Sequence, residues 1–306
     1  MKYLPHYFIF LCVLLNLGCS DSDKGTINSP PFEPYLERVF EGEPGVKYGS
    51  PAFSYDGQFL FFDKTDFGLN PQYEIFAMEY STGLRFPVFE QPGKYQAPAP
   101  SPTSALLAFR DDVELYVQEV GEADETREKI FGWAQPPFSW SPNGHWILCL
   151  VHHDNASSVT SIPVTGGELA VLVDPNEGEQ LAFPSWSPAG DQICYLSYLA
   201  GEYRMAIKAN TSNTPVFLDT GGLGLGDMKW SPVNNEIAFF GYELDENFYN
   251  GIYLYDLDGN TYQRIIPWGP DDGNLDGLNW SPDGKKLVFS MWDSSGGDIY
   301  ELIVRP

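Results

Sequence analysis

Basic residues are scarce in this chain of 306 residues. Lys and Arg together number 17 against 42 Asp and Glu, which gives a formal net charge of −25 at pH 7. Proteins bind a phosphate backbone with clustered Lys and Arg, so this balance excludes nucleic acid as a partner. Hydrophobic residues at 43% and aromatic residues at 15% are too abundant for an acidic disordered tail. The sequence therefore predicts a folded, acidic protein.

Helical patterns and long apolar runs are missing from the body of the chain. No segment repeats its apolar residues at a sustained period of 3.6, as amphipathic helices do. The longest apolar stretch, residues 4–17, is too short to span a membrane and has the length of a signal-peptide core. By contrast, the sequence holds 30 Gly and 25 Pro, the residues typical of tight turns. Many turns without helices predict an all-β protein.

The N-terminal segment has the features of a bacterial lipoprotein signal. The apolar stretch is followed by Gly18 and Cys19, and a small residue before a cysteine resembles the lipobox. The resemblance implies a signal peptide over residues 1–18 and an acyl anchor on Cys19. Because Ser20 follows, it also implies an outer-membrane lipoprotein that faces the periplasm or the cell surface. Residues 19–34 are small and polar, as expected of a flexible tether. An ordinary secretory signal with an incidental cysteine is the alternative.

A turn of the type Ser-Pro-Asp-Gly occurs six times in the remaining chain and follows a tryptophan in four copies. The serines lie 40 to 50 residues apart, at Ser54, Ser101, Ser141, Ser187, Ser231 and Ser281. This period matches the ~40–45 residues of a four-stranded propeller blade. Pro and Gly suit the turn, and short apolar segments typical of strands follow each copy. The sequence thus predicts a propeller of six blades over residues 35–306, with the tryptophan column packed between blades.

The two ends of the chain predict how the ring closes. The sixth copy has room for only three strands before the chain ends at Pro306. Residues 35–40 precede the first copy and have the pattern of a fourth strand such as residues 262–266. If residues 35–40 complete the sixth blade, the array has no unpaired strand edges. We expect four-stranded blades in a ring that is closed by this N-terminal strand.

Only two of the four cysteines lie in the predicted propeller. Cys149 stands one position further along its predicted strand than Cys194 does in the next copy. Successive residues of a strand face opposite sides of the sheet, so the two side chains point in different directions. We expect two buried free thiols rather than a disulfide.

These six copies resemble the propeller repeats of the TolB-like family over the whole predicted ring. The resemblance implies a six-bladed β-propeller of the cell envelope. Two expected features differ from TolB itself: no α/β domain precedes the ring, and Cys19 carries an anchor. Similarity of fold does not carry function, so the partner of TolB is not transferred to this chain.

Candidate binding residues are expected where the six copies differ on a common rim. The positions that end the second strand of each blade are Thr65, Asp112, His152, Tyr198, Tyr242 and Trp292. The connections between blades share that face and supply Tyr48, Tyr95 and Trp133, while His153 and Asp293 follow the second strands. Exposed aromatic rings among carboxylates suit recognition of a sugar or a peptide. We expect a binding surface there. Simple packing at the rim, or use of the opposite rim, are the alternatives.

Motifs for catalysis are incomplete. His152 and His153 are adjacent on a strand and point apart, so we expect no metal site. Residues 221–226 are rich in Gly but open no helix, which excludes a nucleotide site. We therefore expect a non-catalytic module without a cofactor that binds an envelope protein or a neutral glycan, because the negative chain repels anionic polymers. The alternative is a glycan-active lyase or hydrolase that uses carboxylates of the rim.

Overall fold

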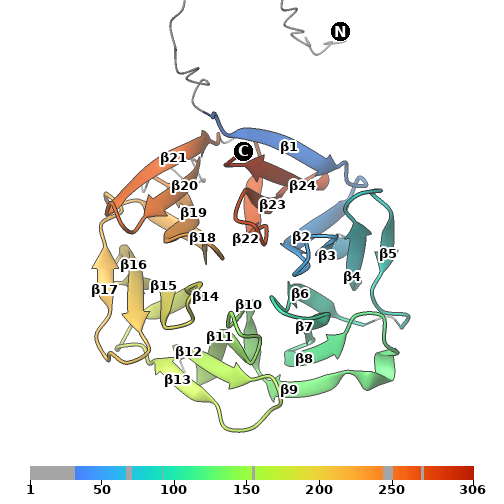
Figure 1. Cartoon of the computed structure of the whole chain (residues 1–306), viewed down its shortest axis with the longest axis horizontal. Helices are drawn as coiled ribbons and strands as arrows, with labels where there is room; N and C mark the ends of the chain where they lie inside the picture. Colours follow the sequence, from blue (N-terminus) through green and yellow to red (C-terminus); the bar gives the residue numbers. More distant parts are fainter. Residues whose placement is uncertain (1–31, 67–70, 92, 154–155, 244–250, 270–271) are drawn as a thin grey trace, which may run out of the picture. The chain divides into compact units, whose positions relative to one another are not determined.

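The computed structural model describes residues 32–66, 71–91, 93–153, 156–243, 251–269 and 272–306. Residues Glu33–Pro306 form a compact unit. Within it, six antiparallel sheets of four strands each stand around a common centre (Figure 1). The six-bladed β-propeller predicted from the repeats is confirmed. The expected signal peptide, the anchor residue Cys19 and the tether up to residue 31 lie outside the described residues, so they remain predictions.

Blades 1 to 5 run in chain order from the centre of the ring outward (Figure 1). The inner strands are β2 (Val46–Phe53), β6 (Tyr95–Pro100), β10 (Ala134–Trp140), β14 (Gln180–Trp186), β18 (Gly224–Trp230) and β22 (Asn274–Trp280). The second strands are β3 (Phe59–Asp66), β7 (Leu106–Asp111), β11 (Trp146–His153), β15 (Gln192–Leu199), β19 (Glu236–Tyr242) and β23 (Lys286–Asp293). The third strands are β4 (Tyr73–Glu79), β8 (Glu114–Glu119), β12 (Ala156–Pro163), β16 (Glu202–Ala209), β20 (Gly251–Asp256) and β24 (Gly296–Ile303). The outer strands are β5 (Arg85–Pro87), β9 (Glu128–Gly132), β13 (Ala170–Val173), β17 (Val216–Leu218), β21 (Thr261–Pro267) and β1 (Tyr35–Phe40).

Helix is limited to a single 3₁₀ turn, η1 (Asp124–Thr126), in the part of the chain that the structure describes. Accordingly, none of the described residues belongs to a helix with the length and apolar character needed to cross a bilayer. The rest of the described chain is strands and the turns between them.

Blade 6 takes its outer strand from the N-terminal end of the ring. Strand β1 pairs antiparallel with β24, with Tyr35 opposite Ile303 and Leu36 opposite Leu302. The two strands, blue and dark red in Figure 1, come from opposite ends of the sequence. This pairing gives β24 a neighbour on both sides and leaves no gap in the ring. The predicted closure by residues 35–40 is confirmed.

The Ser-Pro turns join each inner strand to the second strand of the same blade. In the sixth copy, the Ser281 hydroxyl accepts a hydrogen bond from Lys286 N at 2.9 Å and donates one to Asp283 Oδ1 at 2.6 Å. Gly284 has a φ of +67°, a left-handed conformation that glycine adopts without steric cost. Ser281 is only 5% exposed, so its hydroxyl is an internal cap of the turn. This explains why the motif repeats.

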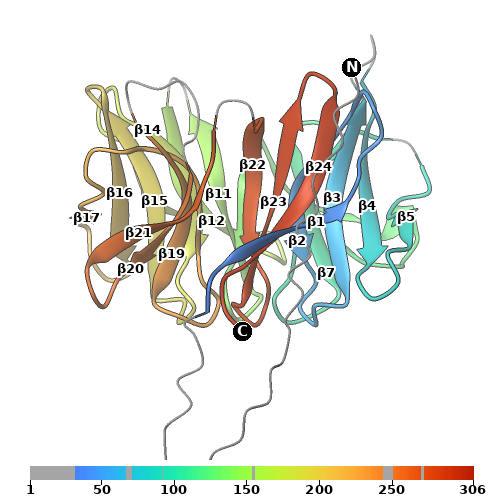
Figure 2. The ribbon, with the colours of Figure 1, turned by 90° about the horizontal axis from the view of Figure 1, so that it is seen from above.

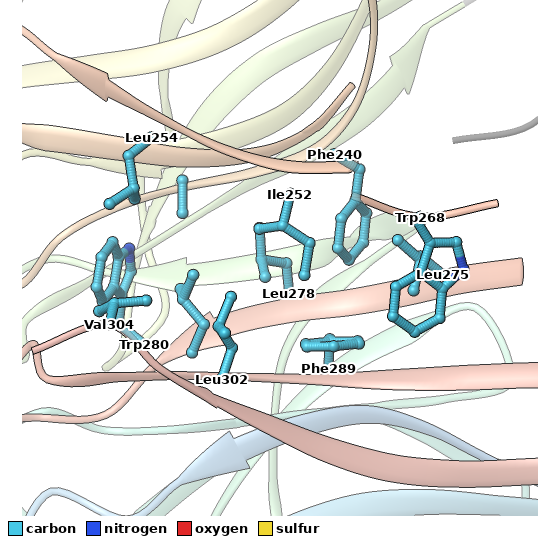
Figure 3. Close-up of a cluster of buried hydrophobic side chains, with 12 residues drawn as sticks. Phe240, Ile252, Leu254, Trp268, Leu275, Leu278, Trp280, Phe289, Leu302 and Val304 are labelled. Carbon is cyan, nitrogen blue, oxygen red and sulfur yellow. The ribbon is translucent and has the colours of Figure 1, made fainter. Parts of the chain in front are cut away.

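The core consists of six clusters of buried side chains, and each cluster joins two neighbouring blades. Figure 3 shows the cluster between blades 5 and 6, where Phe240 and Leu254 pack with Phe289 and Leu302. Trp280 is 8% exposed in this cluster, and its indole Nε1 donates to Lys229 O of the preceding blade at 3.1 Å. The predicted packing of the tryptophan column between blades is confirmed.

The two cysteines of the ring are both buried and free. Burial raises the pKa of each thiol, Cys149 and Cys194, to about 12. A thiol that stays protonated at neutral pH is a poor nucleophile, so both behave as small apolar side chains. The expectation of two free thiols is confirmed.

The ring has two faces, on which the loops gather when it is seen from the side (Figure 2). The six turns of the repeated motif lie on one of them, which we name the turn face. The second strands run away from these turns, so they end on the opposite face, which we name the rim face. The connections between blades also lie on the rim face, because each inner strand runs toward its turn.

Candidate functional site

The predicted column at the ends of the second strands lies on the rim face. His152, Tyr198, Tyr242 and Trp292 fall within the last two residues of β11, β15, β19 and β23, as expected. His152 and His153 are exposed, and His152 Nδ1 lies 3.2 Å from Ser157 Oγ on the neighbouring strand.

Two acidic residues of the predicted surface hold local polar contacts. Asp112 follows β7, is exposed and forms an ion pair of 3.1 Å with Lys94. Asp293 Oδ1 accepts hydrogen bonds from the backbone N and the hydroxyl of Ser295, and these bonds lower the pKa of its carboxyl. The lowered pKa keeps Asp293 ionised at neutral pH, so it adds negative charge to the rim face.

Two predicted residues do not reach the surface. Tyr48 and Tyr95 are each 2% exposed, because they point between blades from the first half of an inner strand rather than from a connecting loop. The ring of Tyr48 packs edge-on against Phe62 with centroids 5.7 Å apart, and the Tyr95 hydroxyl accepts a hydrogen bond of 2.7 Å from Arg127. The expectation that these two rings face a partner is wrong. Both are parts of the core.

Trp133 is strongly exposed. It occupies the connection between β9 and β10, and 69% of its surface is accessible, the highest value for a large hydrophobic residue in the described chain. Its φ of +62° is left-handed, a conformation that a residue with a bulky side chain rarely adopts. A tryptophan held out into solvent is a feature of recognition surfaces.

A group of three tyrosines links blades 4 and 5 on the rim face. Tyr198 and Tyr203 lie with ring centroids 4.6 Å apart, and Tyr203 meets Tyr242 edge-on at 5.7 Å. The ring of Tyr242 lies against Gly224, where an added Cβ would come within 2.2 Å of it. All three side chains are partly exposed. Tyr203 was not predicted, because it is the second residue of the third strand β16, outside the column at the ends of the second strands.

Trp292 lies apart from the three tyrosines, on β23 of blade 6, the blade that β1 completes. Lys47 Nζ lies 4.5 Å from the centroid of its ring and forms an ion pair of 2.7 Å with Asp276. Trp292 and Asp293 also line a cavity of about 240 Å³, together with Glu43 of the segment after β1. The structure thus brings these two predicted residues together in an acidic pocket.

A wide cavity opens on the turn face. It has a volume of about 610 Å³ and is lined by all six inner strands; we name it the funnel. Its mouth is a ring formed by the second residue of each turn motif: Tyr55, Pro102, Pro142, Pro188, Pro232 and Pro282. The next layer is the column before each serine: Phe53, Pro100, Trp140, Trp186, Trp230 and Trp280. The upper part of the funnel is therefore apolar.

Bulges shape the deeper part of the funnel, which we name the floor. Every inner strand shifts its register near the middle, and Ala97 and Phe183 there have left-handed φ values of 52° and 50°. A bulge leaves one backbone amide without a strand partner. Carboxylates take up two of these amides: Asp63 Oδ2 accepts from Ala97 N at 3.0 Å, and Asp227 Oδ2 accepts from Leu278 N at 2.8 Å.

Two charged side chains of β18 lie in the floor. Asp227 is 8% exposed and Lys229 is 7% exposed, and both line the funnel. Burial raises the pKa of the Asp227 carboxyl to about 6; the charge of Asp276 acts in the same direction and Lys229 opposes it. Burial lowers the pKa of the Lys229 amine, which the charge of Asp227 partly offsets. Counting only the second-strand column missed these residues. A lysine and an aspartate at inner-strand positions that hold only uncharged residues in the other five copies were the available signal.

A metal centre is not assembled in the described part of the chain, where no three His, Cys, Asp or Glu side chains are close enough to hold an ion. The acidic and aromatic side chains of the rim face can bind and orient a partner. The funnel can enclose an apolar group and place a polar one on its floor.

Comparisons with known proteins agree with this architecture. No known family model matches the chain. The sequence is 22% identical over 262 residues to an uncharacterised protein of Agrobacterium fabrum, a match that covers 84% of this chain and 74% of that protein. The structure of a putative TolB from Agrobacterium tumefaciens superposes with a TM-score of 0.65 at 19% identity, and the match covers 85% of this chain and 90% of that one.

An oligogalacturonate lyase in complex with manganese has a TM-score of 0.61 at 11% identity and matches over 88% of this chain and 93% of that chain. Proteins with different functions thus share this architecture, and at these identities the likeness concerns the fold. The chain is a six-bladed β-propeller whose fold is like that of the TolB structures.

Proposed function

We propose that this protein is a non-catalytic binding module of the bacterial cell envelope, held at a membrane by an acyl chain on Cys19. Its partner is an envelope protein or a neutral glycan that docks on the rim face. The observation that carries this proposal is the exposure of Trp133 on the same face as the Tyr198, Tyr203 and Tyr242 group. A partner that covers exposed apolar surface stabilises the complex by about 25 cal/mol for each Å² removed from water.

The composition of the rim face agrees with recognition rather than with structural packing. Trp and Tyr are the residues that most often dominate binding energy at interfaces, where they bury a large area at low entropic cost. Trp133 contributes nothing comparable to the core, because 69% of its surface is exposed. The net charge of −25 would attract a basic partner and repel an anionic polymer, and it would not oppose a neutral glycan.

Capture experiments with the full-length protein in detergent test the docking surface. Replacing Trp133 with Ala, or Tyr198, Tyr242 and Trp292 together with Ala, should abolish capture of the envelope partner. Val216→Ala is the matched control, because Val216 is 64% exposed on the outer strand β17, away from the rim aromatics. Unchanged capture by the triple variant would show that the rim face is not the docking surface.

The anchor is tested separately. A Cys19→Ser variant should appear in the soluble fraction of cells, whereas the wild-type chain should sediment with membranes and incorporate labelled palmitate. Membrane retention of the variant would contradict the lipid anchor without affecting the docking proposal.

A glycan-active enzyme is the second candidate, and one contact favours it. His152 is exposed, and the contact of 3.2 Å between its Nδ1 and Ser157 Oγ orients the ring, so its other ring nitrogen can act as the general base of a lyase. Turnover of a panel of neutral and acidic polysaccharides, lost in a His152→Ala variant, would establish this function in place of the first. Binding without turnover in both proteins would exclude it.

A further inference from the structure

The floor of the funnel holds two buried charges of opposite sign with vacant bonding positions. Asp227 and Lys229 are both more than nine-tenths buried. Both lie on β18, next to its bulge between Leu225 and Met228, and both line the funnel. Burying a charge costs free energy unless it is paired or hydrogen-bonded, so each group needs a partner.

Neither group is fully bonded within the described chain. Asp227 Oδ2 accepts from Leu278 N, but Asp227 Oδ1 is buried and has no hydrogen-bond partner. No described carboxylate oxygen lies within 4.0 Å of Lys229 Nζ, and no described hydrogen bond involves that amine. By contrast, Lys286 reaches Glu301 at 3.2 Å and Tyr80 at 2.7 Å in the same propeller. The floor therefore presents one free acceptor and up to three free donors.

The signs of these charges define the ligand. A simple carboxylate would be attracted by Lys229 but repelled by Asp227, and a simple amine would meet the reverse. A group with a cation and an anion side by side satisfies both residues at once. We propose that the floor binds the zwitterionic end of a free α-amino acid, with the ammonium on Asp227 Oδ1 and the carboxylate on Lys229 Nζ.

The funnel above the floor selects the side chain of that amino acid. The walls are the rings of Trp140, Trp230 and Trp280, which are 5–8% exposed, and the mouth is a ring of prolines and Tyr55. Such a wall offers no further charge, so it favours a large apolar or aromatic side chain. A volume of about 610 Å³ leaves ample room for one residue. The site lies on the turn face and is independent of the rim-face docking surface.

Other charged groups near the floor are already engaged. Asp276, which acts electrostatically on Asp227, is bonded to Lys47 at 2.7 Å. Asp63 is bonded to Ala97 N, and its pKa is raised, chiefly by burial. The Cys194 thiol near Lys229 stays protonated at neutral pH, because burial raises its pKa to about 12. Asp227 and Lys229 are therefore the groups available to a ligand.

Titration calorimetry of the full-length protein at pH 7 with three probes tests the proposal. L-Phenylalanine should bind, while N-acetyl-L-phenylalanine lacks the ammonium and L-phenylalaninamide lacks the carboxylate. Both derivatives should bind at least tenfold more weakly, because each leaves one buried charge unpaired. Equal affinity for either derivative would overturn the proposal, as would no binding of L-phenylalanine at concentrations up to about 10 mM. This comparison needs no variant, so it does not depend on mutant folding.

Variants then locate the site. Lys229→Met and Asp227→Asn should each weaken the binding of L-phenylalanine at least tenfold. The matched controls Lys285→Met and Asp174→Asn remove the same charges from exposed positions and should bind as wild type does. The rim triple variant of Tyr198, Tyr242 and Trp292 should also retain the affinity. Wild-type affinity in both floor variants, with unchanged circular dichroism, would overturn the assignment of the site.

The pH dependence gives an independent readout. Asp227 must be ionised to accept from the ammonium, and the pKa of its carboxyl is about 6. Affinity for L-phenylalanine should therefore fall by about tenfold per pH unit as pH drops below that pKa. The Asp227→Asn variant should lose this dependence. A wild-type affinity that stays constant down to pH 4 would contradict the role of Asp227.

Discussion

The two faces of the ring use the same blades in opposite ways. On the turn face, repeated residues form layers: six turn positions make the mouth of the funnel and the tryptophan column makes its wall. On the rim face, equivalent positions hold different residues, from Asp112 and His152 to Tyr198 and Trp292. Repetition thus builds a symmetric apolar cavity, and variation builds an asymmetric surface. The floor of the funnel combines both, since Asp227 and Lys229 break the symmetry inside the repeated wall.

The largest expected effect on stability comes from replacing a tryptophan with alanine on each face. Trp280→Ala on the turn face should lower the free energy of unfolding by about 3–5 kcal/mol, because it opens a cavity between blades 5 and 6. Trp133→Ala on the rim face should change it by less than about 0.5 kcal/mol, since that side chain is mostly in solvent. Urea unfolding followed by tryptophan fluorescence and circular dichroism measures both.

A conservative variant separates packing from hydrogen bonding at this position. Trp280→Phe keeps an aromatic ring, as Phe53 does at the same position of blade 1, but loses the bond from Nε1 to Lys229 O. Its cost should be well below that of Trp280→Ala. Equal costs for the two variants, or equal costs for Trp280→Ala and Trp133→Ala, would contradict the contrast between the faces.

Much of this architecture was accessible from the sequence, because local chemistry determines it. The turn motif, its period and the pattern of residues 35–40 predicted the blades and the closure. The offset of one strand position between Cys149 and Cys194 predicted that these two thiols do not form a disulfide. Burial was harder to predict. Tyr48 and Tyr95 were expected in the connections between blades, but their strands begin earlier than expected, so both side chains lie in the core.

The floor of the funnel was not predicted for a physical reason. A bulge in every inner strand shifts the alternation of its side chains, so simple counting does not show which residues face the centre. Asp227 and Lys229 differ from the residues of the other copies, but only the three-dimensional structure shows that both enter one cavity.

Asp227 gives the second largest expected effect, through the dependence of stability on pH. Its pKa is raised to about 6 in the folded protein, so the native state binds a proton more readily than the unfolded chain. Ionised Asp227 therefore costs stability at pH 7, by about 3 kcal/mol as an upper value, and the cost disappears as pH falls through 6 toward 4. An Asp227→Asn variant should be more stable than wild type at pH 7 and equal to it near pH 4.

Urea unfolding of the Asp227→Asn variant and the wild type from pH 4 to 8 measures this difference. The difference between the two proteins isolates one carboxyl from all others that titrate in the same range. A variant that is less stable than wild type at pH 7 would contradict a net cost of burying the ionised carboxyl.

A smaller effect is expected for the serine that caps a turn. Ser281→Ala removes the acceptor of the hydrogen bond from Lys286 N inside a buried turn, which should lower the free energy of unfolding by about 1–3 kcal/mol. Ser157→Ala on the rim face removes the contact with His152, which is exposed to water, and should cost less than about 0.5 kcal/mol. Thermal unfolding of both variants makes the comparison. Equal shifts would show that the turn serine is not a structural cap.

The smallest effect is expected for Asp293, the rim counterpart of Asp227. Hydrogen bonds from Ser295 lower the pKa of the Asp293 carboxyl, so ionised Asp293 stabilises the fold above the pKa of the unfolded chain, and this stabilisation is lost as pH falls through the lowered value. An Asp293→Asn variant should thus be slightly less stable than wild type at pH 7 and equal to it in strong acid, the reverse of Asp227→Asn. Two aspartates of one ring would then respond to pH with opposite signs, because one lies buried in the floor and the other lies in water with bonded donors. A pair of variants that both gained stability at pH 7 would show that net negative charge, rather than the local setting of each carboxyl, governs the response.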